Sequence, residues 1–172
     1  MAADNFTAMH IRPATEADIP VLRDLARRIW RECYPGIITP EQIEFMLGWM
    51  YSEEEIGRQL ATGVPWEVVE HDGAPLGYLS YQLDPDGRVK ISKLYVLPDQ
   101  QRQGHGRRLL EHICGQARAL GAPGVWLQVN KRNERAIGAY LKAGFHIEKE
   151  AVFDIGNGFV MDDYLMARSV SP

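Results

Sequence analysis

The chain has 172 residues, which is enough for one domain with a sizeable hydrophobic core. Its 45% hydrophobic and 24% charged residues are typical of a soluble globular protein, so the composition excludes a wholly disordered chain. Nineteen Lys and Arg against 23 Asp and Glu give a net charge of −4, which argues against a nucleic-acid-binding protein that relies on a basic face.

The N-terminal segment MAADNFTAMHIRP lacks the basic and apolar regions of a signal peptide. No apolar run approaches the roughly 18 residues that indicate a membrane span. Cys33 and Cys114 have neither CxxC spacing nor a nearby set of histidines. We therefore expect free thiols, no metal site and a reducing cytoplasm. We expect a single domain over residues 1–172, with its core at about 9–168. We expect this domain to bind neither nucleic acid nor membranes.

The first half of the chain changes from helical to extended periodicity. Thr15 followed by Asp18 is typical of a helix start, and apolar residues then recur at three- and four-residue spacing. The expected elements are an extended segment at 9–13, helices from Ile19 to near Tyr34, Thr39 through Trp49 and Ser52 to Gly63, and strands at 66–70, 76–82 and 89–97. Because tight turns at 72–73 and 84–87 separate the three strands, we expect an antiparallel meander.

The second half predicts an alternation of helices and strands. Its expected elements are a helix at 104–120, a strand at 125–129, a helix at 133–143, and a hairpin of strands at 147–155 and 159–167 around the turn at 156–158. Strand 89–97, the next helix and strand 125–129 form a strand-helix-strand unit, which should be parallel and right-handed. The sequence therefore predicts an α+β fold, with a mixed sheet and helices on both faces.

Residues 91–110, ISKLYVLPDQQRQGHGRRLL, carry the most informative pattern. Gly104 and Gly106 allow the backbone to turn its N–H groups toward one point, and the following helix adds unpaired donors and a positive dipole end. A phosphate or pyrophosphate suits such a cradle. The dinucleotide fingerprint would need a glycine at Leu109, and the P-loop would need GK[ST] where Arg107 and Arg108 follow Gly106. A tight turn without ligand and a nucleotide-dependent phosphotransferase are the alternatives.

Two motifs resemble the GCN5-related N-acetyltransferase (GNAT) family. QRQGHG at 101–106 resembles its Q/R-x-x-G-x-G/A signature, and VWLQVNKRNERAIGAYLKAGF at 125–145 resembles its second conserved segment. The resemblance runs from about Met9 to Ala167. It implies the GNAT fold, with direct transfer of the acetyl group of acetyl-CoA to a small-molecule or peptide amine in a ternary complex. A homodimer is a common arrangement for such folds.

The resemblance also implies which residues contact acetyl-CoA, between strands 89–97 and 125–129. The implied set is Leu94, Tyr95, Val96, Gln101, Arg102, Gln103, Gly104, His105, Gly106, Arg107, Asn133 and Tyr140. The backbone at 94–96 would pair with the pantetheine arm, and the loop would hold the pyrophosphate. Asn133 is also a natural helix cap. Tyr140 would be the general acid for the CoA thiolate, although a tyrosine in this position also suits core packing.

The acceptor side departs from the family pattern. Some members supply Glu or His where this chain has Lys90 and Ser92, so the general base stays open among Glu70, His71, Tyr78, Tyr81 and a water chain led by Ser92. The expected substrate-binding residues are Trp30, Tyr34, Tyr81, Ser92 and Asp163.

Two further segments bear on the identity of the acceptor. These segments are DIGNGFVMDDYLM and IWRECYPGIIT. They resemble bacterial acetyltransferases related to spermidine/spermine N-acetyltransferases, and this resemblance implies that the acceptor is a polyamine or another small amine. An antibiotic and a peptide N-terminus are alternative acceptors. A catalytically weak acyl-CoA-binding regulator is the alternative to an enzyme.

Overall fold

The computed structural model describes residues 9–171. Residues 1–8 and residue 172 of the predicted single domain lie outside the described part. The same is true of most of the N-terminal segment in which we predicted no signal peptide. Seven strands form one sheet in the order β1-β2-β3-β4-β5-β7-β6. They are β1 (His10–Pro13), β2 (Trp66–His71), β3 (Ala74–Leu83), β4 (Val89–Val96), β5 (Gly124–Asn130), β6 (His146–Gly156) and β7 (Phe159–Ser169).

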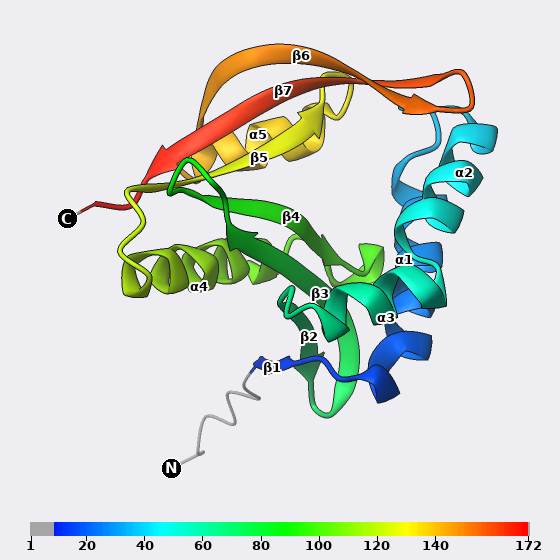
Figure 1. Cartoon of the computed structure of the whole chain (residues 1–172), viewed down its shortest axis with the longest axis horizontal. Coiled ribbons are helices and arrows are strands. Elements are labelled where there is room, and N and C mark those ends of the chain that lie inside the picture. Colours follow the sequence, from blue (N-terminus) through cyan, green and yellow to red (C-terminus); the bar gives the residue numbers. More distant parts are fainter. Residues whose placement is uncertain (1–8, 172) are drawn as a thin grey trace.

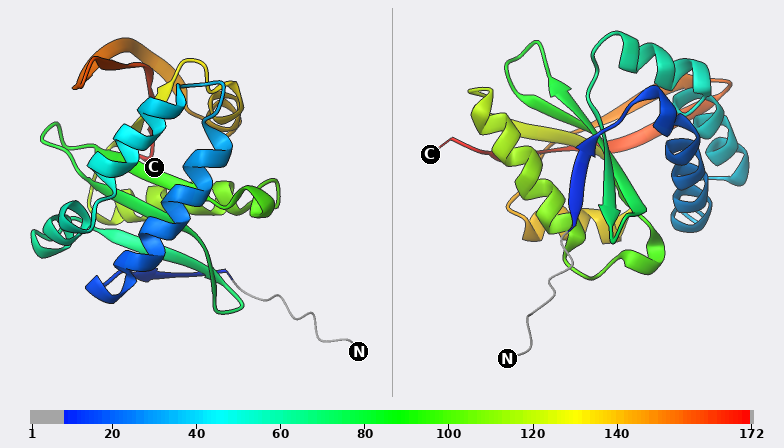
Figure 2. Two further views of the ribbon diagram at one scale, coloured as in Figure 1. Left: turned by 90° about the vertical axis from the view of Figure 1, so that its right-hand side faces the viewer. Right: turned by 90° about the horizontal axis from the view of Figure 1, so that it is seen from below.

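Five α-helices in the described residues cover the two faces of this sheet (Figures 1 and 2). They are α1 (Ile19–Cys33), α2 (Pro40–Met50), α3 (Glu53–Ala61), α4 (His105–Ala119) and α5 (Glu134–Lys142). Helices α1 to α3 pack on one face, and α4 and α5 pack on the other. All neighbouring strands are antiparallel except β4 and β5, which are parallel. The predicted mixed sheet with helices on both faces is therefore confirmed.

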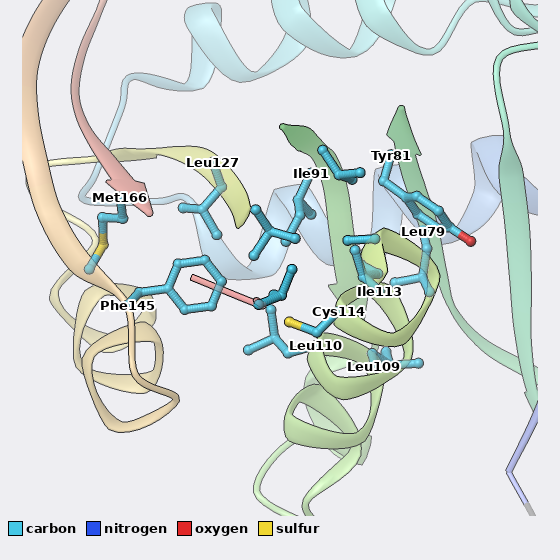
Figure 3. Packing of buried hydrophobic residues seen from close by; sticks show 14 of the residues in the cluster. Leu79, Tyr81, Ile91, Leu109, Leu110, Ile113, Cys114, Leu127, Phe145 and Met166 are labelled. Carbon is cyan, nitrogen blue, oxygen red and sulfur yellow. The ribbon is translucent and has the colours of Figure 1, made fainter. Parts of the chain in front are cut away.

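Each face of the sheet has its own hydrophobic core. On one face, the α4 side chains Leu109 and Ile113 pack with Leu127 and Phe145 (Figure 3). On the other face, the three- and four-residue spacing in α1 buries one side of that helix, including Leu22, against the sheet. Full burial of one such side chain contributes roughly 1.5–3 kcal/mol. The sheet is thus held from both faces.

The parallel pair β4 and β5 separates after a short contact. Its register runs only from Val89 opposite Val125 to Ile91 opposite Leu127, and within the described chain β4 continues to Val96 without β5 beside it. Between β3 and β4 the register shifts so that Ser92 has no opposite residue. Such a β-bulge bends the strand and increases its twist, which turns β4 away from β5. A gap bordered by both strands results.

The start of α1 depends on a buried carboxylate. Asp18 accepts N–H donors from the Arg12 guanidinium at 2.9 and 2.8 Å and from the Thr15 backbone at 2.8 Å. The Arg12 hydrogen bonds, helped by Thr15, lower the pKa of Asp18 against the opposing effect of burial. The predicted pairing of Thr15 with Asp18 at this helix start is therefore present.

We expect Asp18→Asn to lower the free energy of unfolding at pH 7 by roughly 1–3 kcal/mol, because Arg12 loses a charged acceptor. A carboxylate with a lowered folded pKa stabilises the fold above its unfolded pKa of about 3.9 and loses this contribution as pH falls through the folded value. Urea unfolding at pH 7 and pH 3 should therefore give a difference that shrinks in acid. An equal loss at both pH values would assign the effect to packing.

Candidate functional site

The loop before α4 forms a cluster of unpaired backbone donors. Arg102 and Gly104 adopt φ values of 64° and 80°, in the left-handed region, and so reverse the chain just before the helix. Among residues 9–171, the N–H groups of 102–107 make no backbone hydrogen bond, and the first paired one is that of Arg108, which donates to the Gly104 carbonyl. A Cβ atom at Gly104 or Gly106 would meet nothing within 4 Å. The space is open, as an anion cradle requires.

His105 contributes to this cradle through its backbone alone. Its side chain is buried, with both ring nitrogens lacking a hydrogen-bond partner among the described residues, and its ring lies 6.1 Å from that of His71. Burial, followed by the nearby His71 and Arg108, lowers the pKa of His105. A neutral imidazole that points into the protein leaves the positive charge of the loop to Arg102 and Arg107.

The edge of β4 presents alternate backbone groups to the gap. Leu97 donates its N–H to the Leu76 carbonyl across the sheet at 2.8 Å. Because successive residues of a strand point their backbone groups to opposite sides, those of Val96 and Leu94 face the gap and those of Tyr95 face β3. Gln101 Nε2 donates to the Val96 carbonyl at 3.0 Å, which ties the loop to the end of β4.

Tyrosines from both faces of the sheet lie near β4. Tyr34, at the end of α1, shares a hydrogen bond of 3.1 Å with Tyr95 of β4, and the Trp30 ring stacks on Tyr34 with centroids 4.4 Å apart. Tyr140 comes from α5 on the opposite face, near enough for its charge to interact with those of Tyr34 and Tyr95. Burial, with a smaller contribution from Tyr34, raises the pKa of Tyr140. The phenol is therefore protonated at neutral pH and available as a donor.

Asp163 adds a carboxylate near enough to Tyr34 for the two charges to interact. It lies in β7 opposite Asn130 of β5 and is only 1% exposed. Neither carboxylate oxygen has a hydrogen-bond partner within the described part of the chain. Burial, and then the adjacent Asp162, raise the pKa of Asp163 to about 6, while Lys131 opposes the shift. The structure thus brings together Trp30, Tyr34, Asp163 and Tyr140.

Other predicted residues lie elsewhere. The Tyr81 hydroxyl donates to Glu67 at 2.7 Å, a carboxylate that also contacts His112, so Tyr81 belongs to the α4 face. Ser92 is exposed at the bulge. Asn133 caps α5 by accepting the Ala136 N–H at 3.3 Å, which is the alternative that the sequence left open. The structure does not gather these three with Tyr34.

The candidate general bases already make contacts within the protein. Glu70 forms an ion pair with Arg12 at 3.0 Å, and the Tyr78 hydroxyl donates to Tyr51 at 2.8 Å. His71 lies near His105 and Asp72. None of these contacts directs a free acceptor toward Tyr140.

One contact, made by Arg132, could not be predicted from the sequence. Its guanidinium donates to the carbonyls of Gly36 and Ile37 at 2.8 and 3.2 Å, which joins the α1–α2 loop to the loop after β5. The contact borders a cleft of about 400 Å³. Backbone carbonyls carry no sequence signal, and these lie 95 and 96 positions away, so only the fold reveals the link.

Residues 9–171 contain no cluster of three or more His, Cys, Asp or Glu side chains suited to a metal ion. No helix in the same range is long and apolar enough to span a membrane. Cys33 and Cys114 are free thiols, as predicted. Burial raises the pKa of both, so both favour the protonated, unreactive form.

Comparisons with known proteins agree with this geometry. The sequence model of the acetyltransferase (GNAT) family matches residues 22–145. An uncharacterised N-acetyltransferase of Mycobacterium tuberculosis is 31% identical over 159 residues, covering 91% of this chain and 99% of the relative. A ribosomal protein bS18-alanine N-acetyltransferase of Escherichia coli is 34% identical over 102 residues, covering 51% and 69%. The PaiA N-acetyltransferase of Thermoplasma acidophilum, solved with coenzyme A, superposes with a TM-score of 0.79 at 22% identity, covering 94% and 99%.

Proposed function

The chain belongs to the acetyltransferase (GNAT) family, and we propose that it transfers the acetyl group of acetyl-CoA directly to an amine in a ternary complex. The observation that carries this proposal is the gap between β4 and β5, with unpaired backbone donors in the loop that follows β4 and with Tyr140 near Tyr95 of β4. Acetyl-CoA supplies an activated thioester there. The chain supplies binding, orientation and control of protons.

Binding of acetyl-CoA rests on backbone groups. The N–H groups of 102–107 would hold the pyrophosphate, with Arg102 and Arg107 adding charge. The groups of Leu94 and Val96 that face the gap would pair with the pantetheine arm as an added strand does. The Val96 N–H would then lie where it can polarise the thioester carbonyl.

Tyr140 would act as the general acid for the departing thiolate. Its raised pKa keeps the proton on the phenol until sulfur carries negative charge, since even an unshifted phenol of about 10 against a thiol of about 8.5 opposes transfer by roughly 2 kcal/mol. A hydrogen bond that shortens late in the step fits this order. Direct transfer also fits the half-buried thiol of Cys33 and the buried thiol of Cys114, because their raised pKa values disfavour a thiolate nucleophile.

We propose a small primary amine, such as a polyamine, as the acceptor, because Asp163 places a negative charge beside Tyr34. The similarity to the bS18-alanine N-acetyltransferase supports a peptide N-terminus as the second candidate. The presence of Tyr140 disfavours a regulator that only binds acyl-CoA. Two free thiols suit a reducing compartment, so we propose that the enzyme is cytoplasmic.

Acetyl-CoA is expected to stabilise the protein where Mg-ATP does not. At about 100 times its Kd, the ligand should add roughly 2.7 kcal/mol to the free energy of unfolding. Thermal unfolding with either ligand measures this difference. Stabilisation by Mg-ATP alone would favour the nucleotide-dependent phosphotransferase and contradict the acetyltransferase.

Release of free thiol from acetyl-CoA, measured with a panel of amines and peptides, tests transfer itself. Release that depends on the amine supports the enzyme and ranks its acceptors. Stabilisation by acetyl-CoA with no thiol release above background hydrolysis for any acceptor would instead support the acyl-CoA-binding regulator.

A further inference from the structure

We propose that Asp163 binds the acceptor as an ammonium ion and then takes its proton, acting as the general base for a primary amine that is cationic in solution. This inference rests on the proposed acetyltransferase function and deepens it. It assigns the base that the strand positions Lys90 and Ser92 do not supply.

The first support is a buried carboxylate that lacks a donor. Buried charged groups are normally paired, because an isolated one carries a large desolvation cost. Asp163 is 1% exposed, and neither oxygen has a partner among residues 9–171. The ammonium group of Lys131 is occupied by Glu150 at 3.0 Å and Asp162 at 2.9 Å. A donor from outside the chain, such as an ammonium with its three N–H groups, would satisfy the carboxylate.

The second support is the position of this carboxylate. Asp163 shares a face of β7 with Met161, two residues away, which packs against the core beneath α1 and α2. Its charge interacts with Tyr34, whose pKa rises to about 12 through burial, and Tyr34 also interacts with Tyr140. Because β4 and β5 pair only as far as Ile91 and Leu127, no strand pairing closes the gap near Asp163, which lies opposite Asn130. An amine held by Asp163 would therefore approach the gap from the α1 face, whereas Tyr140 comes from the α5 face.

In the proposed reaction, Asp163 takes one proton and later releases it, and Tyr140 gives one proton and later regains it. The R–NH3+ nitrogen gives a proton to an Asp163 carboxylate oxygen and regains its lone pair. That pair forms the C–N bond to the thioester carbon, and the C–S bond breaks with its electrons going to sulfur. The thiolate takes the Tyr140 proton, and the amide nitrogen returns its extra proton to the Tyr140 oxygen. Asp163 finally releases its proton to water.

A base of this kind is required for an alkyl amine. With a pKa near 10.4, such an amine is neutral in only about 4 parts in 10⁴ at pH 7. The charged and titratable groups that interact with Asp163 are Tyr34 directly after α1, Lys131 after β5 and Asp162 from β7, and Glu150 from β6 pairs with Lys131. Burial and Asp162 raise the pKa of Asp163 to about 6, so it is ionised at neutral pH and protonated in mild acid. We expect kcat/KM to fall as pH drops through about 6.

The test compares wild type with Asp163→Asn, a substitution of equal size that removes the charge. With a primary alkyl amine at pH 7.5, kcat/KM should fall at least about 100-fold, the lower end of general base catalysis. The acidic limb near pH 6 should disappear, and stabilisation by acetyl-CoA should stay unchanged. A kcat/KM within threefold of wild type, with the limb intact, would overturn the inference.

Asp162→Asn is the matched control, because it removes the same charge one residue away, on the opposite face of β7. It should keep the acidic limb but move it to lower pH, since the repulsion that raises the pKa of Asp163 is gone. An unmoved limb would contradict the assignment even if Asp163→Asn failed to fold. A loss of kcat/KM as large as that of Asp163→Asn would assign the effect to the general field of the strand and overturn the inference.

Thermal unfolding of the protein without ligands tests the buried carboxylate without measuring turnover. A carboxylate whose folded pKa is raised destabilises the fold above that value, and this cost disappears as pH falls toward the unfolded pKa. Asp163→Asn should therefore unfold at a higher temperature than wild type at pH 7.5, with a smaller difference at pH 5. An equal difference at both pH values would count against a buried, ionised carboxylate.

If wild type neither binds acetyl-CoA nor releases thiol, the proposed function itself fails. An active wild type with an unaffected Asp163→Asn variant would refute the role of Asp163 alone.

Discussion

Tyr140→Phe is expected to lower kcat by roughly 10²- to 10⁴-fold, the range of general acid catalysis, while the affinity for acetyl-CoA changes little. The substitution removes one hydroxyl group and keeps the ring that packs 5.6 Å from Phe145. Within the described chain, no hydrogen bond of this hydroxyl competes with the substrate, so its loss should be felt in the transition state. The fold should remain intact.

Steady-state and single-turnover kinetics with the best amine measure this effect. Single turnover must show that chemistry limits the rate, because slow product release would hide a loss in the chemical step. Tyr164→Phe is the control, since this tyrosine of β7 packs against the same core and lies 5.6 Å from the Lys131 ammonium. A Tyr140→Phe enzyme with unchanged kcat in the chemical step would remove the general acid role.

Local backbone chemistry explains why the loop and helices could be predicted. Thr39 and Ser52 accept the N–H groups of Gln42 and Glu55, as their places before helical runs suggested. The left-handed Gly104 and the open start of α4 likewise follow from residues adjacent in sequence. Such features depend on a few neighbouring positions and therefore leave a clear pattern.

The bulge in β4 was missed for the opposite reason. Regular alternation would place Ile91 and Lys93 on one face, but the extra residue Ser92 moves Lys93 and Tyr95 to the α1 side. The adjacent polar pair Ser92–Lys93 is the only local signal of this change. Lys93 becomes buried, and burial lowers its pKa to about 8, with its ammonium 4.8 Å from the Trp66 ring. No spacing rule gives that environment.

The same limit explains which predicted site residues meet. Trp30 lies in the last turn of α1 and Tyr34 directly follows that helix, so their joint position follows from α1. Their approach to Asp163 depends on the placement of β7 beside β5, which the sequence expectation left unspecified. Tyr81 was placed with them from the sequence, but its hydroxyl reaches Glu67 on β2 instead.

Gly77→Ala is expected to destabilise the protein by about 3 kcal/mol, at the upper end of the cost of overpacking. A Cβ atom at this position would overlap the backbone carbonyl oxygen of Tyr95 and lie 3.3 Å from Val96 Cα. Both atoms belong to the β4 backbone, which cannot move aside as a flexible side chain can. Relief requires β4 to shift from β3 at the level where it borders the gap.

This shift should also weaken the binding of acetyl-CoA, because the backbone groups of Leu94 and Val96 face the gap from the displaced segment. Urea unfolding and acetyl-CoA titration of the same variant measure the two effects. Gly115→Ala is the control: a Cβ there meets nothing within 4 Å, and alanine in the middle of α4 should stabilise the helix by roughly 0.5–1 kcal/mol. If Gly77→Ala lost stability but kept full affinity, the β4 edge would not be the surface that holds the cosubstrate.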